Sequence, residues 1–338
     1  MSVVSPLVSV VLPVFNGSPY LQDAIDSILV QVHDDYELIV IDDGSTDDSA
    51  LILERLNDPR IRFFRQPNQG LAATLNRGIA HARGQYIARQ DQDDLSYPER
   101  LEKQVTFMES HPDCVLLGTW AQILEVDRPV DRFHRHPVDE AELRYQMLFN
   151  NPFVHSSVML RKEAVQQVGG YTTDPDRQPP EDFELWSRLS RVGQVANIGE
   201  VLMAYREIPG SMSRVGPSPF RRRLITICAE NLAAAALLAP DDPDVVAIAA
   251  LTHGEAEALP GRPDFSRMQS LLLRAIDSFA PDPQALSLRQ DALGRVEAMR
   301  AGWMVRDSAA YGLLHTVGPV RNVAKRIWRL LQRFRRTR

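Results

Sequence analysis

The chain has 338 residues, of which 44% are hydrophobic and 24% are charged, with a formal net charge of −6. This length corresponds to about two domains, and the composition excludes collagen-like, coiled-coil and disordered chains. The two cysteines, Cys114 and Cys228, are too few and too far apart for a disulfide framework or a zinc cluster. We therefore expect a globular protein from a reducing, intracellular compartment.

The charge is unevenly distributed along the chain. Residues 321–338 carry eight Lys or Arg and no acid, which leaves 30 basic against 44 acidic residues before them. The acidic body argues against nucleic acid as the main partner. Residues 319–338 also have apolar side chains at helical spacing, which predicts a basic amphipathic helix. This helix either lies on an anionic membrane surface or docks on the acidic body of the protein itself.

Two apolar segments need a separate explanation. The N-terminal run has no basic flank or cleavage site, so it predicts a first strand and not a signal peptide. The apolar run at 232–239 is too short to span a membrane. We expect a cytoplasmic protein, with the tail as a possible contact to the inner face of the plasma membrane.

The first 110 residues alternate strand patterns with helix patterns. Apolar β-rich runs predict strands at 7–14, 37–43, 61–66 and 85–90, and helical spacing predicts helices at 20–31, 45–56, 70–82 and 98–110. Strands separated by single helices form βαβ units. We therefore expect an α/β fold with a mostly parallel sheet flanked by helices, and ligands at the carboxyl ends of its strands.

The rest of the chain changes character near residue 215. Strand patterns at 114–124, 155–161 and 194–199 and a helix at 182–191 predict completion of the first domain. Beyond residue 213 only helices are predicted, at 219–239, 243–258, 264–279 and 283–316. The predicted organisation is an α/β domain at 1–215, an all-helical C-terminal region at 216–318 and the basic tail at 319–338.

Carboxylates gather where two predicted strands end. The first group comprises Asp42, Asp43 and Asp47, and the second comprises Asp91, Asp93 and Asp94. Neighbouring carboxylates repel one another unless a cation or hydrogen-bond donors compensate, so their clustering at a ligand-binding edge favours a functional site. A few carboxylates together with bound phosphates are the usual surroundings of Mg²⁺ or Mn²⁺.

Several alternatives bear on these acids. Asp43, Ser45 or Thr46 could simply cap the following helix. The spacing after Asp91 does not fit an EF-hand, and the glycine-rich motifs of dinucleotide-binding folds and P-loop NTPases do not occur. A third acidic point, Asp182, lies near the start of a predicted helix, where the helix dipole favours an ionised carboxylate.

Seven motifs occur in an order and spacing that resemble the family 2 glycosyltransferases of the GT-A fold. They are SVVLPVFNG, YELIVIDDGSTDDS, NQGLAATLNRGI, GQYIARQDQDDLSYPERLEKQ, HSSVMLRKEAVQQVGGY, PEDFELWSRL and LMAYRE. The resemblance spans about residues 7–213. It implies a nucleotide-diphosphate sugar donor, usually a UDP-sugar, a Mg²⁺ or Mn²⁺ cofactor, and inversion at the anomeric carbon.

The resemblance also implies roles for residues that bind the donor nucleoside. Pro13, Phe15 and Asn16 should lie along the nucleoside, with Phe15 against the base. Asp43 should accept a hydrogen bond from the base.

The remaining implied roles concern the metal and the acceptor. Asp93 should coordinate the diphosphate-bound metal, with Asp91 as the first acid of the D-x-D pair and Asp94 supporting the loop. Asp182 should be the general base that deprotonates the acceptor hydroxyl.

The chain departs from the family pattern at two points. Gln90 and Gln92 replace the apolar and small residues usual around the D-x-D pair, and they could contact the donor or the metal ligands. The histidine that often follows LMAYR is missing, so Arg206 or Arg214 could serve as a phosphate clamp.

These observations predict an inverting glycosyltransferase that moves a sugar from a nucleotide-diphosphate sugar to a hydroxyl of a glycan or lipid-linked acceptor. Surface polysaccharide or glycoconjugate biosynthesis is the expected setting. One alternative is a sugar-nucleotide-binding or scaffold protein without turnover, which a turnover assay would identify. Another is a nucleotidyltransferase, for which the lack of Lys or Arg in PVFNGSPY is unfavourable.

Overall fold

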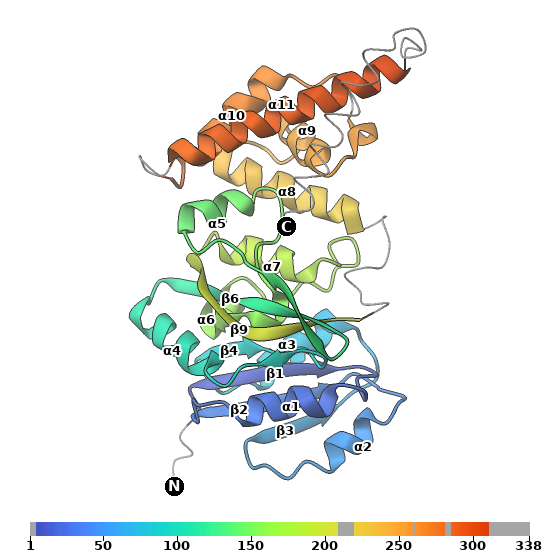
Figure 1. The fold of residues 1–338 in the computed structure, drawn as a ribbon, viewed down its shortest axis with the longest axis vertical. Coiled ribbons are helices and arrows are strands. Elements are labelled where there is room, and N and C mark those ends of the chain that lie inside the picture. Colours follow the sequence, from blue (N-terminus) through green and yellow to red (C-terminus); the bar gives the residue numbers. More distant parts are fainter. Residues whose placement is uncertain (1–4, 209–219, 260, 281–284, 311–338) are drawn as a thin grey trace. The chain divides into compact units, whose positions relative to one another are not determined.

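The computed structural model describes residues 5–208, 220–259, 261–280 and 285–310 (Figure 1). The chain divides into two compact units, Met1–Gln146 with Asn151–Arg223 and Met147–Asn150 with Leu224–Arg338. We call them the α/β unit and the helical unit. The domain boundary predicted near residue 215 and the tail at 319–338 lie outside the described residues.

The α/β unit is built on a nine-stranded mixed sheet with the order β3-β2-β1-β4-β8-β6-β9-β5, in which β7 also pairs with β6. The strands are β1 (Val8–Val14), β2 (Tyr36–Asp42), β3 (Ile61–Arg65), β4 (Tyr86–Arg89), β5 (Leu95–Ser96), β6 (Cys114–Glu125), β7 (Arg128–His134), β8 (Met159–Arg161) and β9 (Gln194–Glu207). Strands β1 to β4 are parallel to their neighbours among themselves. This half confirms the predicted βαβ pattern.

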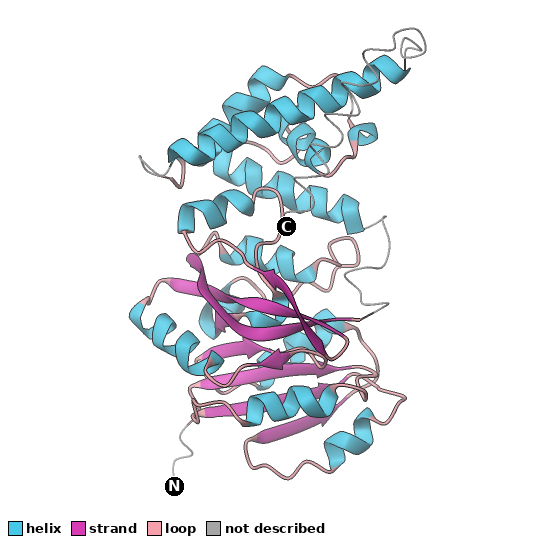
Figure 2. Ribbon diagram, in the orientation of Figure 1, coloured by secondary structure: helices cyan, strands magenta, loops and turns pink. Residues whose placement is uncertain are grey.

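Helices flank this sheet and connect its strands (Figure 2). They are α1 (Leu21–Leu29), α2 (Ser49–Glu54), α3 (Leu71–His81), α4 (Arg100–Ser110), α5 (Glu140–Gln146), α6 (Lys162–Gln167) and α7 (Glu181–Leu189), with a 3-10 turn η1 (His155–Ser157). The four helices predicted in the first 110 residues and the one predicted at 182–191 are confirmed.

The second half of the sheet makes it mixed. Strand β8 is antiparallel to both β4 and β6, and β9 runs parallel to β6 but antiparallel to β5. The short elements β5, β7, α5 and α6 have too few residues to show a periodic pattern in the sequence. Strand β5 matters for the site because it ties the segment after β4 to β9.

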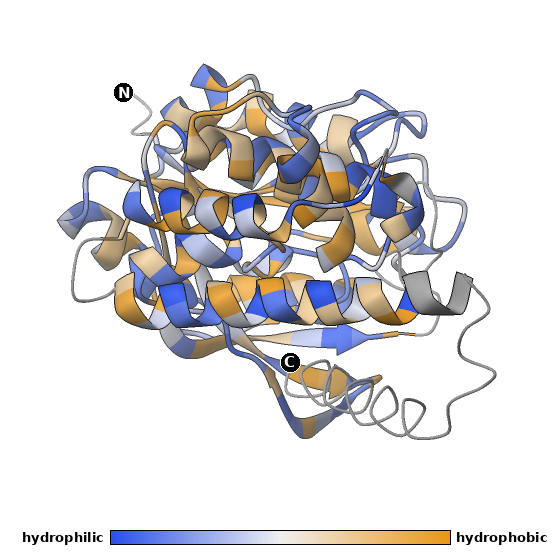
Figure 3. Cartoon of the chain, turned by 90° about the horizontal axis from the view of Figure 1, so that it is seen from above, coloured by the Kyte–Doolittle hydropathy of each residue, from blue (hydrophilic) through white to orange (hydrophobic). Residues whose placement is uncertain are grey.

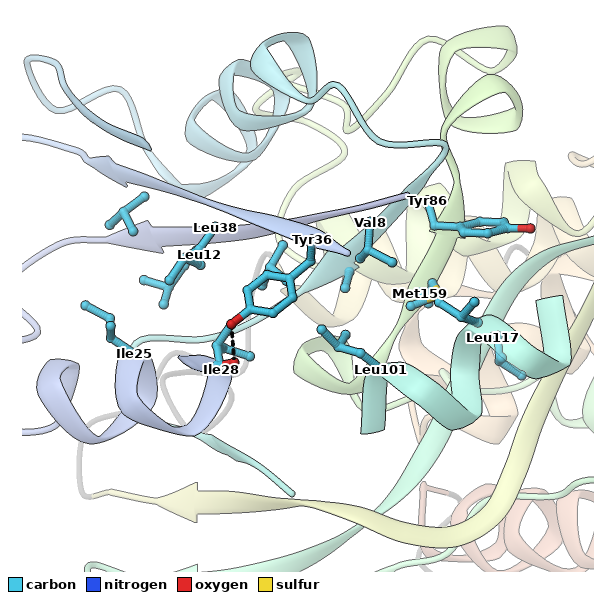
Figure 4. Packing of buried hydrophobic residues seen from close by; sticks show 14 of the residues in the cluster. Val8, Leu12, Ile25, Ile28, Tyr36, Leu38, Tyr86, Leu101, Leu117 and Met159 are labelled. Atoms are coloured by element: carbon cyan, nitrogen blue, oxygen red, sulfur yellow. Dashed lines mark hydrogen bonds between the residues drawn. The ribbon is translucent and has the colours of Figure 1, made fainter. Parts of the chain in front are cut away.

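Alternating side chains along the strands build the core on one face of the sheet. Val8 and Leu12 of β1 and Leu38 of β2 pack against α1 and α4 (Figure 4). The Tyr36 hydroxyl lies in this core and donates a 2.9 Å hydrogen bond to the Ile28 carbonyl. Fully burying such side chains contributes about 1.5–3 kcal/mol each, so this core holds the strand ends in place.

Helix α3 packs on the opposite face of β1, and its close approach depends on a glycine. A Cβ atom at Gly78 would lie 2.4 Å from Cγ1 of Val11. A side chain at this position would therefore push α3 away from the sheet, together with the loop that precedes it.

The helical unit contains α8 (Phe220–Ala236) from Leu224 onward, α9 (Pro243–Thr252), the 3-10 turn η3 (Ala256–Ala258), α10 (Phe265–Asp277) and α11 (Ala285–Ala310). Asp242 and Asp264 cap α9 and α10, each accepting two backbone N–H bonds. Helix α11 carries hydrophilic and hydrophobic residues in alternating bands (Figure 3), and its side chains Ala285, Leu288, Ala292 and Val296 are buried. In the part of the chain that the structure describes, no helix is long and apolar enough to cross a bilayer.

Candidate active site

Three loops follow the carboxyl ends of β1, β2 and β4, which are neighbours in the sheet. Because these strands are parallel, their loops meet at one edge. We call Asp42, Asp43 and Asp47 the β2 loop acids, and Asp91, Asp93 and Asp94 the β4 loop acids. The two groups predicted from the sequence thus lie at the same edge of the sheet.

The loop after β1 exposes the residues expected near a nucleoside. Phe15 is 46% exposed, whereas Pro13 is buried one residue before the end of β1. Asn16 adopts a positive φ of 52°, a conformation that Asn tolerates better than most residues. Its backbone N–H donates to the Ser45 hydroxyl at 3.0 Å, and its side-chain oxygen accepts from the Thr46 N–H at 2.9 Å.

These contacts change the interpretation of Ser45 and Thr46. Helix α2 begins after Asp48, and no side-chain cap is present at its start. The capping alternative is therefore wrong for Ser45 and Thr46, whose hydrogen bonds instead hold the β1 loop in its conformation.

Asp43 is almost fully buried and accepts three hydrogen bonds from the segment before α3. Its Oδ1 accepts from Gln66 Nε2 at 2.7 Å and from the Gln69 N–H at 2.8 Å, and its Oδ2 accepts from the Gly70 N–H at 2.9 Å. Two of these donors are backbone groups next to the first turn of α3. Asp43 therefore orders the start of α3, and not the start of α2, which follows it in the sequence.

Asp47 is also satisfied within the protein. Its carboxylate accepts 3.0 Å hydrogen bonds from the N–H groups of Ser18 and Ser49. Burial works to raise its pKa, but the hydrogen bonds from Ser49 and Ser18 outweigh burial and lower the pKa to about 2. This carboxylate is therefore ionised and committed to loop structure.

The β4 loop acids form a tight group whose ligand oxygens all lie within 4.8 Å of one another. Asp94 is buried; it accepts from the Arg206 N–H at 2.8 Å and from the Ser156 hydroxyl. Asp91 forms an ion pair with Arg89. Among the described residues, no other residue donates a hydrogen bond to the Asp93 carboxylate.

The electrostatics of this group differ from those of Asp47. Burial, followed by the charge of Asp91, raises the pKa of Asp93 to about 6. Burial and the charges of Asp91 and Asp93 raise the pKa of Asp94 well above its usual value. A divalent cation would offset this repulsion, and oxygen ligands suit Mg²⁺ or Mn²⁺. The donor set therefore fits such an ion, with Asp93 as the carboxylate free to bind it.

Two residues that depart from the family pattern have structural contacts. The Gln92 amide accepts from the Phe15 N–H at 2.9 Å and donates to the Phe15 carbonyl at 3.1 Å. Arg206 is 3% exposed, and its side chain donates to the Asp93 carbonyl at 2.8 Å and pairs with Asp127. The phosphate-clamp alternative is wrong for Arg206, and Arg214 lies outside the described residues.

Asp182 lies in the first turn of α7 and keeps partial exposure. Its Oδ2 accepts from Asn151 Nδ2 at 2.8 Å, and its Oδ1 accepts from the Phe183 N–H at 2.7 Å. Burial raises its pKa above the usual value. The neighbouring Glu181 is more deeply buried, and burial together with the charge of Asp182 raises its pKa to about 7.

The β4 loop acids and the Glu181–Asp182 pair are linked through Arg89. The Arg89 charge lowers the pKa of Asp93, of Glu181 and of Asp182, and the Asp91 charge raises the pKa of Glu181. Buried and partly buried charges are screened less than exposed ones, so these groups influence one another's protonation. Carboxylates from distant parts of the chain therefore share one electrostatic environment.

Sequence reasoning missed three residues of this environment. Arg89 could have been noticed as a charge at the end of the otherwise apolar strand 85–90. Asn151 and Ser156 lie in segments whose sequence shows no motif for their contacts with Asp182 and Asp94.

Comparisons with known proteins agree with this geometry. The family model "Glycosyl transferase family 2" matches residues 9–169. The chain is 35% identical to "Putative glycosyltransferase EpsE" of Bacillus subtilis over 67% of this chain and 79% of EpsE. It is 34% identical to "Amylovoran biosynthesis glycosyltransferase AmsE" of Erwinia amylovora over 55% of this chain and 70% of AmsE.

A solved structure shares the fold. S. aureus TarS, residues 1–349, in complex with UDP-GlcNAc, superposes with a TM-score of 0.59 at 17% identity, covering 90% of this chain and 92% of that chain. At this identity the likeness shows the GT-A-type fold alone. On the sequence matches and the site together, this chain is a glycosyltransferase enzyme and belongs to glycosyltransferase family 2.

Proposed function

We propose that the protein is an inverting, metal-dependent transferase that moves a sugar from a nucleotide-diphosphate sugar, most simply a UDP-sugar, to an acceptor hydroxyl. The observation that carries this proposal is the cluster of β4 loop acids, whose ligand oxygens lie within 4.8 Å of one another, with Arg89 paired to Asp91; the effect of the Arg89 charge on the pKa of Asp182 supports it. A transferase of this kind needs the leaving diphosphate and the acceptor base on opposite sides of one sugar.

The donor half of the site follows from the loops after β1, β2 and β4. The exposed Phe15 offers a ring face to the base, and Pro13 and Asn16 border the nucleoside. A carboxylate has about four acceptor positions, of which Asp43 uses three, so one remains for an N–H of the base. Asp93 would hold Mg²⁺ or Mn²⁺, with Asp91 and Asp94 beside it, and that ion would neutralise charge building on the leaving diphosphate.

The acceptor half of the site centres on Asp182. The Asn151 amide fixes the orientation of its carboxylate, and the raised pKa makes it a better proton acceptor than an exposed aspartate. One displacement assisted by one base inverts the anomeric carbon. Retaining hydrolases, in contrast, add a second carboxylate as nucleophile.

The biological setting is proposed from the relatives. AmsE is named for amylovoran biosynthesis, and the TarS structure contains UDP-GlcNAc. We infer that this chain extends a surface polysaccharide or related glycoconjugate, with a glycan or a lipid-linked sugar as acceptor.

Contact with the inner face of the plasma membrane through residues 319–338 stays a prediction, because these residues lie outside the described part of the chain. Co-sedimentation with anionic vesicles tests it. The prediction fails if a chain ending at Gly318 binds the vesicles as well as the full chain does.

The proposed reaction is tested by a thermal-shift panel of nucleotide sugars with and without Mn²⁺, followed by a turnover assay with the donor that shifts the melting temperature most. We expect Asp182→Asn to lower turnover by about 10²–10⁴-fold while donor binding is retained. Glu163→Gln, which removes an exposed carboxylate of α6, serves as the control. Full turnover in Asp182→Asn would remove the assigned base, and donor binding without any turnover in the wild type would favour a binding protein.

A further inference from the structure

Two buried arginines lie next to each other behind the β4 loop acids, and they differ in how their side chains are satisfied. Arg89 is 2% exposed and Arg100 is fully buried. Arg100 Nη2 donates a 2.7 Å hydrogen bond to the Arg89 carbonyl, so the two residues belong to one part of the core. Burying a guanidinium is costly unless its donors and its charge are compensated.

The cost of burying the Arg100 guanidinium is compensated by hydrogen bonds to neutral acceptors. Its Nε donates to Gln104 Oε1 at 3.1 Å, and its Nη1 donates to Gln90 Oε1 at 3.1 Å and to the Ser96 hydroxyl at 2.7 Å. The bond to Gln104 lies within α4, whereas the bonds to Gln90 and Ser96 tie α4 to the segment around the β4 loop. Arg100 therefore fixes the local fold.

Arg89 is compensated by charge instead. Its side chain pairs with Asp91, and within the described residues its Nε has no hydrogen-bond partner. An unpaired buried donor costs about 1–3 kcal/mol, so a residue present only for stability would be better replaced by an apolar one. The position of the charge offers a reason for keeping it.

The Arg89 charge acts on both halves of the site. Arg89 ends β4, where its N–H donates to the Val158 carbonyl at 2.9 Å. Its charge lowers the pKa of Asp93, Glu181 and Asp182, and the charges of Asp91 and Asp94 raise the pKa of Arg89 in turn. Asp91, through its ion pair, is the acid most strongly held by this charge.

We propose that Arg89 is a positioning residue that pairs with Asp91 and so withholds it from the metal, which leaves Asp93 as the carboxylate presented to the ion. This inference rests on the proposed metal-dependent transfer and assigns a division of labour within the D-x-D pair. Arg89 lowers the affinity of the empty site for a cation. It also maintains the geometry of the β4 loop and the ionisation of the proposed base, Asp182.

The test is a titration of Mn²⁺ alone into the full chain. The electron paramagnetic resonance signal of the free aquo-ion measures the unbound Mn²⁺, so the test requires no turnover. Arg89→Gln frees Asp91 and removes a repelling charge, so we expect Mn²⁺ to bind at least about threefold more tightly. Arg89→Lys keeps the charge and should stay within about twofold of the wild type. A residue with a merely structural role would give weaker binding in both variants.

The single variants of the acids provide a second arm that does not depend on the folding of Arg89→Gln. Asp93→Asn should weaken Mn²⁺ binding by at least about tenfold more than Asp91→Asn. The double variant Arg89→Gln/Asp91→Asn removes the pair as a unit and restores the charge balance, so it should return close to the wild-type affinity. Equal losses in Asp91→Asn and Asp93→Asn would overturn the proposal.

Turnover adds a third readout and separates this inference from the proposed function. We expect Arg89→Gln to lower kcat by at least about tenfold with a smaller change in the KM of the donor, and Arg89→Lys to recover most of kcat.

Arg100→Lys is the matched control, with a lower melting temperature but unchanged Mn²⁺ affinity per folded protein. Weaker Mn²⁺ binding in a folded Arg89→Gln overturns the role of Arg89 while transfer stands. A wild type that binds no Mn²⁺ overturns it together with the metal assignment, and sugar transfer is then judged by turnover alone.

Discussion

The β2 loop acids and the β4 loop acids lie at the same edge of one sheet and have similar sequences, but the protein balances them differently. The carboxylates of Asp43 and Asp47 accept hydrogen bonds from backbone N–H groups, and the pKa of Asp47 falls to about 2. In the β4 loop, burial and mutual repulsion raise the pKa of Asp93 to about 6. Acids that are satisfied by the backbone build loops, whereas acids that repel one another are available to bind a cation.

Asp93→Asn tests this difference between the two groups of acids most directly. Because Asp93 is the β4 loop acid whose carboxylate accepts no hydrogen bond from another residue in the described part of the chain, we expect kcat/KM to fall by at least about 100-fold. The melting temperature should stay the same or rise, because one repelling charge is removed. Turnover assays and thermal melts check both expectations.

Asp58→Asn controls for the loss of a carboxylate, since Asp58 pairs with Arg60 at the start of β3, away from the site. Its turnover should match the wild type. A large loss of stability in Asp93→Asn would place Asp93 with the β2 loop acids.

Asp43→Ala should show the opposite behaviour. It leaves two backbone N–H groups before α3 without their acceptor, so we expect the free energy of unfolding to fall by about 2–3 kcal/mol. Mn²⁺ affinity per folded protein should not change. Denaturant unfolding and Mn²⁺ titration measure the two effects, and a loss of Mn²⁺ affinity would contradict the division between the two groups.

The pH dependence of stability tests the raised pKa values of the acids in the site. The pKa of Asp93 is raised to about 6 and that of Glu181 to about 7 in the folded chain, above their values near 4 in an unfolded chain. The folded chain therefore binds protons more tightly, and its stability falls as the pH rises through these values. We expect these two groups to lower the melting temperature by a few degrees, on the order of 1 kcal/mol, between pH 5.5 and 8, whereas His134 and His155, whose pKa values burial lowers, act in the opposite direction.

Glu181→Gln should reduce this slope, and Mn²⁺ should reduce it further by neutralising Asp93. Melts over the pH series, with and without Mn²⁺, provide the measurement. The lowered pKa of Asp47 acts only at lower pH, where it gives a slope of opposite sign. An unchanged slope in Glu181→Gln would contradict the raised pKa of Glu181.

Gln92→Leu should have the smallest effect. It keeps the size of the side chain but removes both hydrogen bonds to Phe15, which lie at a partly exposed site. We expect the KM of the donor to rise about threefold, with little change in kcat. Steady-state kinetics check this, and an equal fall in kcat would place Gln92 closer to the reacting sugar.

Much of the α/β unit could be predicted from the sequence, because its first four strands are short apolar β-rich runs and the helices between them have helical spacing. Strands β5 and β7 could not, because two or seven residues with mixed burial show no such pattern. The antiparallel pairing of β8 depends on contacts between distant segments, which periodicity does not report.

The positions of the acids were predictable, but their individual contacts were not. Sequence reasoning placed Asp91, Asp93 and Asp94 at one edge, and the structure groups them. It did not identify Arg89 as the partner of Asp91, since the pair depends on how a buried side chain turns at the end of β4. Asp43 was expected at the nucleoside, and its three bonds to the segment before α3 arise from a loop that no motif describes.

The bridge between Gln92 and Phe15 has a practical consequence for engineering donor preference. One amide joins the loop that would face the nucleobase to the loop that would carry the ion, and a side chain at Gly17 would collide with it. Chimeric enzymes designed for a new base specificity should exchange residues 15–18 and 90–94 together. If only one segment is exchanged, the hydrogen bonds between the two loops are lost.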